Sequence, residues 1–177
     1  LVAGGFLIRK QGEGTFVRKN MLHRKVSFTE KLKKVLNPKK NSEKFCTDIS
    51  ICNDLNIRTK FDTSDPLYEI VQKATIDETM WKIQKRYVQS SKLDEASVER
   101  IAKGGSVSKE LALEKNLVNM PMSMTIEFKE LDTQEAEELQ SHSLVVVKKT
   151  IVSNATKEVV EYSETFIHPN FYEIEIA

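Results

Sequence analysis

The sequence has few of the features that mark secreted and membrane proteins. Its 177 residues include two cysteines, too few for a disulfide scaffold or a four-cysteine zinc site. The longest unbroken apolar run is Leu144 to Val147, whereas a membrane-spanning helix needs about 20 apolar residues. The first residues also lack the charged and apolar segments of a secretory signal. We therefore predict a cytoplasmic protein with reduced thiols and no membrane contact.

Histidine is also scarce. The sequence has three, His23, His142 and His168, and they lack the spacing of metal ligands. We expect all three to be surface residues, and we expect neither a metal site nor a cofactor.

Charge is abundant but unevenly distributed, although the net charge is only +1. Residues 1–44 carry twelve Lys/Arg and three Asp/Glu, whereas residues 45–177 carry fifteen and twenty-three. The two segments therefore have formal charges of +9 and −8. A basic end joined to an acidic body indicates contact with a polyanion at that end, and a solvated basic tail is the alternative.

The basic end begins with a pattern typical of a β-hairpin. Two apolar arms, residues 6–8 and 15–17, flank a turn at residues 11–14 that contains two glycines. Glycine permits positive φ in the turn and lets the backbone approach another molecule closely. Basic residues follow both arms and put positive charge on them: Arg9, Lys10, Arg18 and Lys19.

This hairpin resembles the wing of the winged helix-turn-helix domain in GntR-type transcription regulators. The matching pattern is Leu1, Gly5, an apolar step that ends in Arg9, and the run GEGTFV at residues 12–17. The resemblance implies DNA contacts from the residues in and beside the turn: Arg9, Lys10, Gln11, Gly12, Gly14, Thr15 and Arg18. A generic surface hairpin is the alternative. Because the base-reading helix of such a domain would precede Leu1, we expect further residues upstream, and we expect the wing itself to contact phosphates.

A short basic connector at residues 21–25 precedes the motif SFTE at residues 27–30. The motif predicts the start of a helix that ends at Asn37-Pro38. In the HutC branch of GntR regulators, SFTE at this place marks the start of the effector-binding domain, called UTRA, whose fold resembles chorismate lyase. The resemblance implies three parts: a partial winged helix-turn-helix (residues 1–20), a linker (21–27) and an effector-binding domain (28–177).

The body alternates between strand and helix patterns, in the order expected of such a domain. We predict strands at residues 45–52, 67–76, 80–88, 122–130, 143–152 and 158–167, a last strand in FYEIEI, and helices at 93–103, 107–116 and 133–140. The predicted fold class is α+β, a chorismate-lyase-like antiparallel sheet with flanking helices, preceded by the hairpin wing. In an extended strand Cys46 and Cys52 are roughly 20 Å apart, too far for a disulfide. Met80 and Trp81 are expected in the core or in a dimer contact.

The first strand hairpin of phosphosugar-sensing relatives carries Arg-x-Arg on one strand and Glu on the next. Those places fall here on Gln72, Ala74 and Gln84. A cationic clamp for a phosphate or carboxylate is therefore weakened, and a cleft that has lost ligand binding is one alternative.

Two other parts of the family's effector site persist in this sequence. The segment GGSVS ends in Ser106, Val107 and Ser108, where the family has a serine-containing helix start. Simple helix capping by Ser106 is the alternative there. Glu161 aligns with a family carboxylate that contacts polar ligand groups, and a solvated edge glutamate is the competing interpretation.

The resemblance implies a bacterial transcription regulator, a homodimer that binds double-stranded operator DNA and a small polar effector that changes operator affinity. A sugar or amino-sugar derivative would suit amide side chains and one carboxylate. The alternative is an effector-independent DNA-binding or dimerisation module. An enzyme of the chorismate-lyase type would need cationic groups at the positions of Gln72 and Ala74, so we predict no enzyme activity.

Overall fold

The structure is a computed structural model that describes residues 7–10, 14–17, 26–30, 43–76, 79–111, 121–130, 134–153 and 155–176, with side chains described between residues 46 and 172 of these. The chain forms two compact units. One comprises residues 1–29 and 173–177, and the other comprises residues 30–172.

The smaller unit contains the predicted hairpin. Strands β1 (Leu7–Lys10) and β2 (Gly14–Val17) pair antiparallel, with Lys10 opposite Gly14. Four of the residues that the resemblance assigns to DNA contact lie in these strands: Arg9, Lys10, Gly14 and Thr15. The other three lie outside the described residues: Gln11, Gly12 and Arg18.

The predicted helix at SFTE is wrong. Residues Val26–Glu30 form a strand, β3, which pairs with the last strand, β10 (Tyr172–Ile176). Val26, Phe28 and Thr29 favour extended backbone, and a distant partner strand supplies the hydrogen bonds that a local helix would have made. The rest of the predicted helix, residues 31–36, lies outside the described residues.

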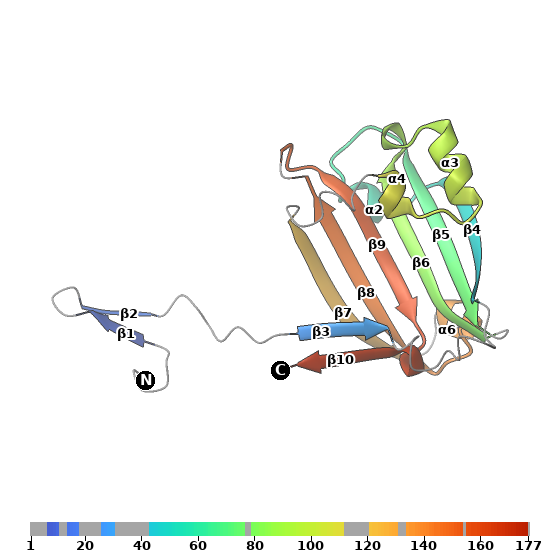
Figure 1. Ribbon diagram of the computed structural model, residues 1–177. Coiled ribbons are helices and arrows are strands. Elements are labelled where there is room, and N and C mark those ends of the chain that lie inside the picture. The colour runs from blue at the N-terminus through green and yellow to red at the C-terminus, as the bar shows by residue number, and fades with distance from the viewer. Residues whose placement is uncertain are drawn as a thin grey trace. The chain divides into compact units, whose positions relative to one another are not determined.

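A six-stranded antiparallel sheet dominates the larger unit (Figure 1). Its strands are β4 (Glu43–Ile51), β5 (Leu67–Ile76), β6 (Thr79–Gln89), β7 (Met122–Glu130), β8 (Ser143–Val152) and β9 (Val159–Ile167). Their order is β4-β5-β6-β9-β8-β7, so two hairpins meet where β6 pairs with β9. The predicted strands are confirmed to within two residues, and the α+β fold class is confirmed with them.

Short helices connect the strands. These are α2 (Leu55–Arg58), η1 (Ser90–Lys92), α3 (Glu95–Ala102), α4 (Val107–Glu110), α6 (Gln134–Glu138) and η3 (Pro169–Phe171). Helix α3 begins where Asp94 accepts a hydrogen bond from the Ser97 amide at 2.7 Å. Helix α2, which the sequence pattern did not predict, begins in the same way at Asp54. The second half of the predicted helix 107–116 lies outside the described residues from 112 onward.

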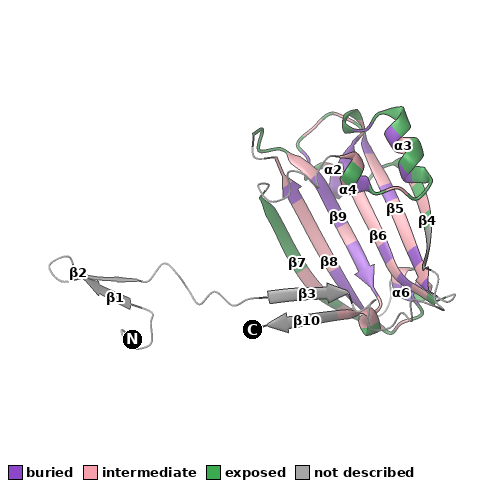
Figure 2. Cartoon of the chain, in the orientation of Figure 1, coloured by how far each residue is buried: buried purple, intermediate pink, exposed green. Residues whose placement is uncertain are grey.

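Helices lie on both faces of the sheet. Side chains alternate between the two faces along each strand, so each face has apolar side chains for a helix to cover. On the face that we call the α4 face, α3 and α4 pack through Leu93, Ile101 and Val107 against the strands. On the other face, the α6 face, α6 packs through Ala136 and Leu139, and residues of α2 and its flanking turns pack beside Tyr87 and Tyr162. Trp81 is fully buried in a further core cluster, so of its two predicted positions, the core or a dimer contact, the structure shows the core. Figure 2 shows where the buried residues lie along the strands and helices.

Candidate functional site

A row of polar side chains crosses the α4 face of the sheet. The strand register places Thr47 beside Gln72, Gln72 beside Gln84, and Gln84 beside Thr165. Gln72 Nε2 lies 3.4 Å from Thr47 Oγ1, and Gln84 Nε2 donates to Thr165 Oγ1 at 3.1 Å. Two of the three predicted hairpin positions, Gln72 and Gln84, therefore face the same polar row.

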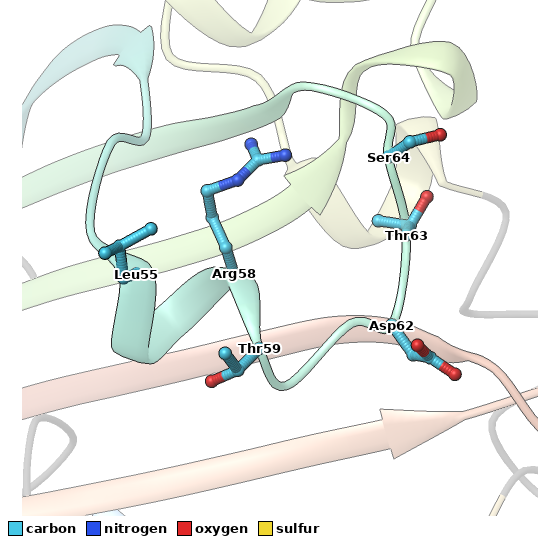
Figure 3. A pocket seen from close by; sticks show the side chains of 6 residues that line it. All are labelled: Leu55, Arg58, Thr59, Asp62, Thr63 and Ser64. Carbon is cyan, nitrogen blue, oxygen red and sulfur yellow. The ribbon is translucent and has the colours of Figure 1, made fainter.

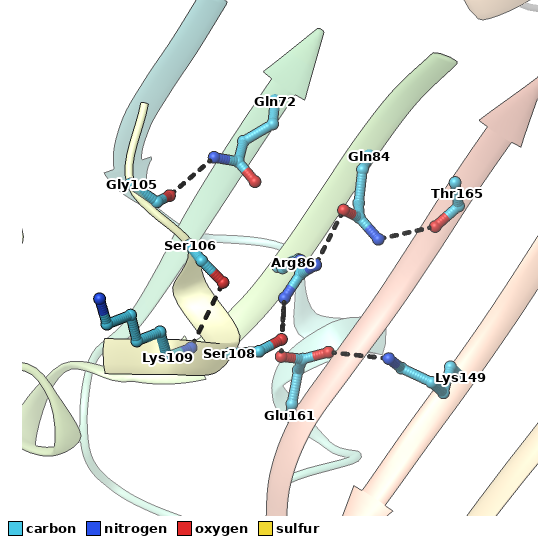
Figure 4. A network of polar contacts seen from close by, with 10 residues as sticks. All are labelled: Gln72, Gln84, Arg86, Gly105, Ser106, Ser108, Lys109, Lys149, Glu161 and Thr165. Carbon is cyan, nitrogen blue, oxygen red and sulfur yellow. Dashed lines mark hydrogen bonds and ion pairs between the residues drawn. The ribbon is translucent and has the colours of Figure 1, made fainter. Parts of the chain in front are cut away.

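Arg86 lies next to this row, two residues beyond Gln84 on the same face of β6. Its Nη2 donates to Gln84 Oε1 at 3.0 Å, and its Nη1 donates to Ser108 Oγ at 2.9 Å (Figure 4). The same Nη1 lies 3.4 Å from Glu161 Oε2. Only 14% of the Arg86 side chain is exposed. One guanidinium therefore joins β6, α4 and β9.

Glu161 is fully buried at the centre of this network. Its strand, β9, lies between β6 and β8, so the interpretation as a solvated edge glutamate is wrong. Lys149 Nζ approaches Glu161 Oε1 to 3.6 Å from the neighbouring strand. Both ion pairs are longer than the 2.7–2.9 Å usual for charge-assisted hydrogen bonds. A buried carboxylate thus sits loosely between two cations.

Two buried polar atoms in the network have no hydrogen-bond partner. They are Glu161 Oε1, an acceptor, and Arg86 Nε, a donor. Leaving a buried polar group unpaired costs about 1–3 kcal/mol, so most such groups in native proteins are satisfied. The cluster is therefore suited to a group that can both donate and accept hydrogen bonds.

The start of α4 contributes unequally to the network. Ser106 is the N-cap, since its side chain accepts from the Lys109 amide, and its exposed hydroxyl therefore serves helix capping. Val107 is buried in the core. Ser108 alone of these three contacts Arg86.

A glycine pair sets the path of the chain before α4. Gly104 has a φ of +92°, and a Cβ built on Gly105 would lie 2.6 Å from the carbonyl oxygen of Arg100. Only glycine fits this close turn without a backbone shift. The turn brings the Gly105 carbonyl within 3.4 Å of Gln72 Nε2. It thereby holds α4 above the polar row.

The structure brings together four of the seven predicted effector residues: Gln72, Gln84, Ser108 and Glu161. Ala74 is buried in the core cluster of Trp81 instead. Arg86 and Lys149 were missed by the sequence analysis. Their signal was the alternation of strand residues, which places Arg86 on the face of Gln84, but the pairing of β6 with β9 was needed to bring Arg86 to Glu161. The cluster therefore contains two cations, Arg86 and Lys149, at positions other than those of Gln72, Ala74 and Gln84.

The α6 face carries a separate polar hollow of about 260 Å³. It is lined by two lysines among several acids: Asp48, Glu69, Val71, Lys73, Lys85, Gln134, Glu135 and Glu138. Lys73 pairs with Glu138 and Lys85 with Glu135. Beside the hollow, burial and the hydrogen bond from Tyr87 to Glu69 raise the pKa of Tyr87 above its ordinary value. The lysines of this hollow already have acidic partners within the protein.

A wider surface hollow of about 520 Å³ lies beside α2 (Figure 3). Its lining residues are Leu55, Arg58, Thr59, Asp62, Thr63 and Ser64. Several of these side chains point apart, and the Arg58 guanidinium already has a partner in the Asp65 carbonyl oxygen, which lies 3.4 Å from its Nη2. The hollow gathers no catalytic or ligand-binding constellation.

The remaining predictions concern thiols, histidines and the membrane. Cys46 and Cys52 are free, the former exposed and the latter buried. Of the three histidines predicted at the surface, His142 is exposed, His168 is half-buried, and His23 lies outside the described residues. His168 accepts from the Asn170 amide at 3.2 Å, and burial lowers the His168 pKa. In the described part of the chain, no cluster of three or more His, Cys, Asp or Glu side chains could hold a metal. None of the described helices is long and apolar enough to cross a membrane.

Neither a protein-family model nor a curated protein matches this chain. Solved structures do. PhnF from Mycobacterium smegmatis is 14% identical over 97% of this chain and 77% of its own, with a TM-score of 0.58. The C-terminal domain of the histidine utilization repressor from Pseudomonas syringae is 10% identical over 77% of this chain and 96% of its own, with a TM-score of 0.56. A GntR-family transcriptional regulator from Enterococcus faecalis is 14% identical over 75% of this chain and 96% of its own, with a TM-score of 0.57. At these identities, what the chain shares with these proteins is their fold.

Proposed function

We propose that this chain acts in a bacterial transcription regulator of the GntR type, in the HutC branch. Residues 1–20 form part of a winged helix-turn-helix, residues 21–27 form a linker, and residues 28–177 bind a small polar effector. The fold shared with solved GntR-type regulators supports this proposal, as does a β-hairpin with the sequence pattern of a wing. A homodimer would present two such wings to the two half-sites of a palindromic operator.

The observation that carries the effector proposal is the fully buried Glu161 between Arg86 and Lys149. Stability alone does not account for this cluster, since replacing buried ion pairs by well-packed apolar residues is often neutral or stabilising. The cluster also lies beside polar residues from α4, β5 and β6, among them Ser108, Gln72 and Gln84. Polar groups that converge from several elements are typical of a ligand site.

The chemistry of the cluster selects the effector class. Glu161 is the acceptor for hydroxyl or ammonium groups, because an ionised carboxylate donates no hydrogen bonds. Arg86 Nε requires an acceptor, and a sugar hydroxyl can donate and accept at once. Gln72 and Gln84 add amide donors and acceptors in place of charges. The effector is therefore small and rich in hydroxyl or amino groups, such as a sugar or an amino sugar, and a phosphate is not required for its binding.

Effector binding changes operator affinity if it favours one of two arrangements of the DNA-binding heads. Such coupling is typically ~1–3 kcal/mol. The arrangement favoured by the effector then determines whether DNA binding is strengthened or weakened.

A thermal-shift screen of sugars, amino sugars, amino acids and organic acids tests the proposal. We expect a hydroxyl-rich or amino-bearing compound to raise the melting temperature, and Glu161→Gln to reduce that rise. Glu164→Gln is the matched control, because Glu164 lies on the same strand but on the α6 face, where it accepts from Tyr162. If both variants lose the ligand-induced stabilisation equally, or if neither loses it, the assignment of Glu161 to the effector site is contradicted. A chain that binds DNA and responds to no compound would indicate the effector-independent module.

A further inference from the structure

The cluster around Glu161 is closed to a ligand in this structure. Glu161 is fully buried, and the Arg86 side chain is 14% exposed. Neither of the two hollows described above is lined by these residues. Glu161 Oε1 and Arg86 Nε nevertheless lack hydrogen-bond partners, and an outside group that satisfies them must first reach them. Access to the cluster therefore requires that a covering element moves.

Helix α4 covers one side of this cluster. Its Ser108 Oγ accepts from Arg86 Nη1 at 2.9 Å, and the same nitrogen lies 3.4 Å from Glu161 Oε2 (Figure 4). Just before the helix, the Gly105 carbonyl lies 3.4 Å from Gln72 Nε2. Both contacts hold α4 against polar side chains of β5 and β6. Separating α4 from the sheet would remove one acceptor from the Arg86 nitrogen and expose its side chain.

The helix is anchored to the sheet by few apolar contacts. It has four residues, of which Val107 is the buried one, and Leu111 after it is partly buried. The turn before it contains Gly104, with a φ of +92°, and Gly105. Glycine adopts backbone conformations that other residues rarely reach, and segments with few buried apolar contacts open most readily. Helix α4 is therefore suited to move about this turn while the sheet stays folded.

An ion pair fastens the last residue of α4 to α3. Glu110 Oε1 accepts from Arg100 Nε at 3.0 Å, and Glu110 Oε2 accepts from Arg100 Nη2 at 2.7 Å. Such two-point pairs are the strongest contacts between arginine and a carboxylate. The same Nη2 donates to Ser97 Oγ at 3.0 Å, which orients the guanidinium on α3. The Glu110 side chain is only 13% exposed, so the pair is partly shielded from water.

We propose that α4 is a lid over the Arg86–Glu161 cluster and that the Arg100–Glu110 ion pair holds this lid closed. The glycine turn is its hinge, and the effector reaches the cluster through the open form. A ligand that binds only the open form has an apparent affinity reduced by the fraction of open molecules. The ion pair thus sets effector affinity without touching the effector, so Arg100 and Glu110 are positioning residues.

The lid rests on the proposed function for what passes beneath it, but its opening is a property of the chain alone. Opening is measurable without any compound, whereas effector binding is measured by the thermal-shift screen. A lid that does not open as proposed, in a chain that binds a compound, overturns only this inference. A lid that opens in a chain that binds no compound overturns only the effector site.

Thiol labelling measures the opening of the lid. In a Cys46→Ser background, Ser163→Cys places a thiol in the buried cluster, opposite Arg86 in the strand register. The chain's own Cys52 is buried in a core cluster on the α6 face, so its labelling reports wider unfolding. Iodoacetamide modifies a thiol only when the thiol is accessible, and mass spectrometry follows the labelling rate of both sites.

We expect Glu110→Gln to raise the labelling rate at the Ser163→Cys position by about fivefold and to leave that of Cys52 unchanged. Glu99→Gln is the matched control, because it breaks an ion pair of 3.6 Å at the end of α3 and leaves the pair with α4 in place. The double variant Arg100→Glu with Glu110→Arg restores opposite charges and should return the rate toward that of the parent. An unchanged rate in Glu110→Gln, no recovery in the double variant, or equal acceleration at both thiols would overturn the proposal.

Discussion

Arg86 Nη1 lies between two acceptors, Ser108 Oγ at 2.9 Å and the Oε2 of the fully buried Glu161 at 3.4 Å. The contact between Arg86 and Glu161 joins residues 75 positions apart in the chain, and it exists because β6 pairs with β9. Arg86 thus couples the helix above the sheet to the carboxylate at its centre. A ligand that competes for either acceptor would break one of these two contacts of Arg86.

Removing Arg86 should destabilise the protein, because Glu161 would keep only the 3.6 Å contact with Lys149. We expect Arg86→Met to lower the free energy of unfolding by about 3 kcal/mol, the lower end for a broken buried pair. The double variant with Glu161→Leu should recover most of this loss, since no buried carboxylate remains. Urea denaturation measures the free energy of unfolding of both variants. A loss below about 1 kcal/mol in Arg86→Met would show that the pair contributes little.

The two serines of α4 should separate stability from ligand binding. Ser106→Ala removes an N-cap and should cost about 1 kcal/mol of stability with little effect on ligand-induced stabilisation. Ser108→Ala removes an acceptor of Arg86 and should reduce ligand-induced stabilisation more than it lowers intrinsic stability. Thermal melts with and without the stabilising compound give both quantities. The reverse pattern would place the ligand at the helix cap instead.

Alkaline pH should unfold the protein through its buried tyrosines. Burial and a hydrogen bond to a carboxylate raise the pKa of Tyr87 and of Tyr162 above the ordinary value of 10.0. Above pH ~10 the unfolded tyrosine loses its proton while the folded one keeps it, so stability falls as pH rises, by about 1.4 kcal/mol per pH unit for each tyrosine. Tyr87→Phe should reduce this slope in denaturation curves at pH 10–12. An unchanged slope would contradict the raised pKa.

The hairpin should contribute phosphate contacts when the protein binds DNA. We expect Arg9→Ala and Lys10→Ala each to weaken binding to every DNA sequence and to lower the salt slope by about one unit. Affinity measured against salt concentration, on specific and unrelated duplexes, tests this. If neither variant changes the slope, the hairpin does not act as a wing.

The sequence predicted elements whose signal is local. The alternation in MSMTIEFKE predicted β7 with both of its ends, and the hairpins around residues 77–79 and 154–157 were equally clear. The sequence-based prediction was wrong at β3. The capping residues of SFTE favoured a helix there, but β10, more than 140 residues away, supplies a partner strand for β3.

The candidate site was predictable only in part, for a related reason. Glu161 and the glutamines came from a family pattern, whereas Arg86 and Lys149 belong to the site through strand order. The register that brings Lys149 and Arg86 to opposite sides of Ser163 is a property of the folded sheet. Nothing in the spacing of these residues along the chain specifies it.

The most direct test of the effector site is calorimetric titration with an amino sugar and its phosphate ester. The account predicts that the chain binds both, with affinities within about tenfold of each other, and that Glu161→Gln weakens both. That result would be consistent with amide side chains, Gln72 and Gln84, in place of a cationic phosphate clamp. Binding of the phosphate ester at low micromolar concentration, with no binding of the unphosphorylated compound, would contradict the account.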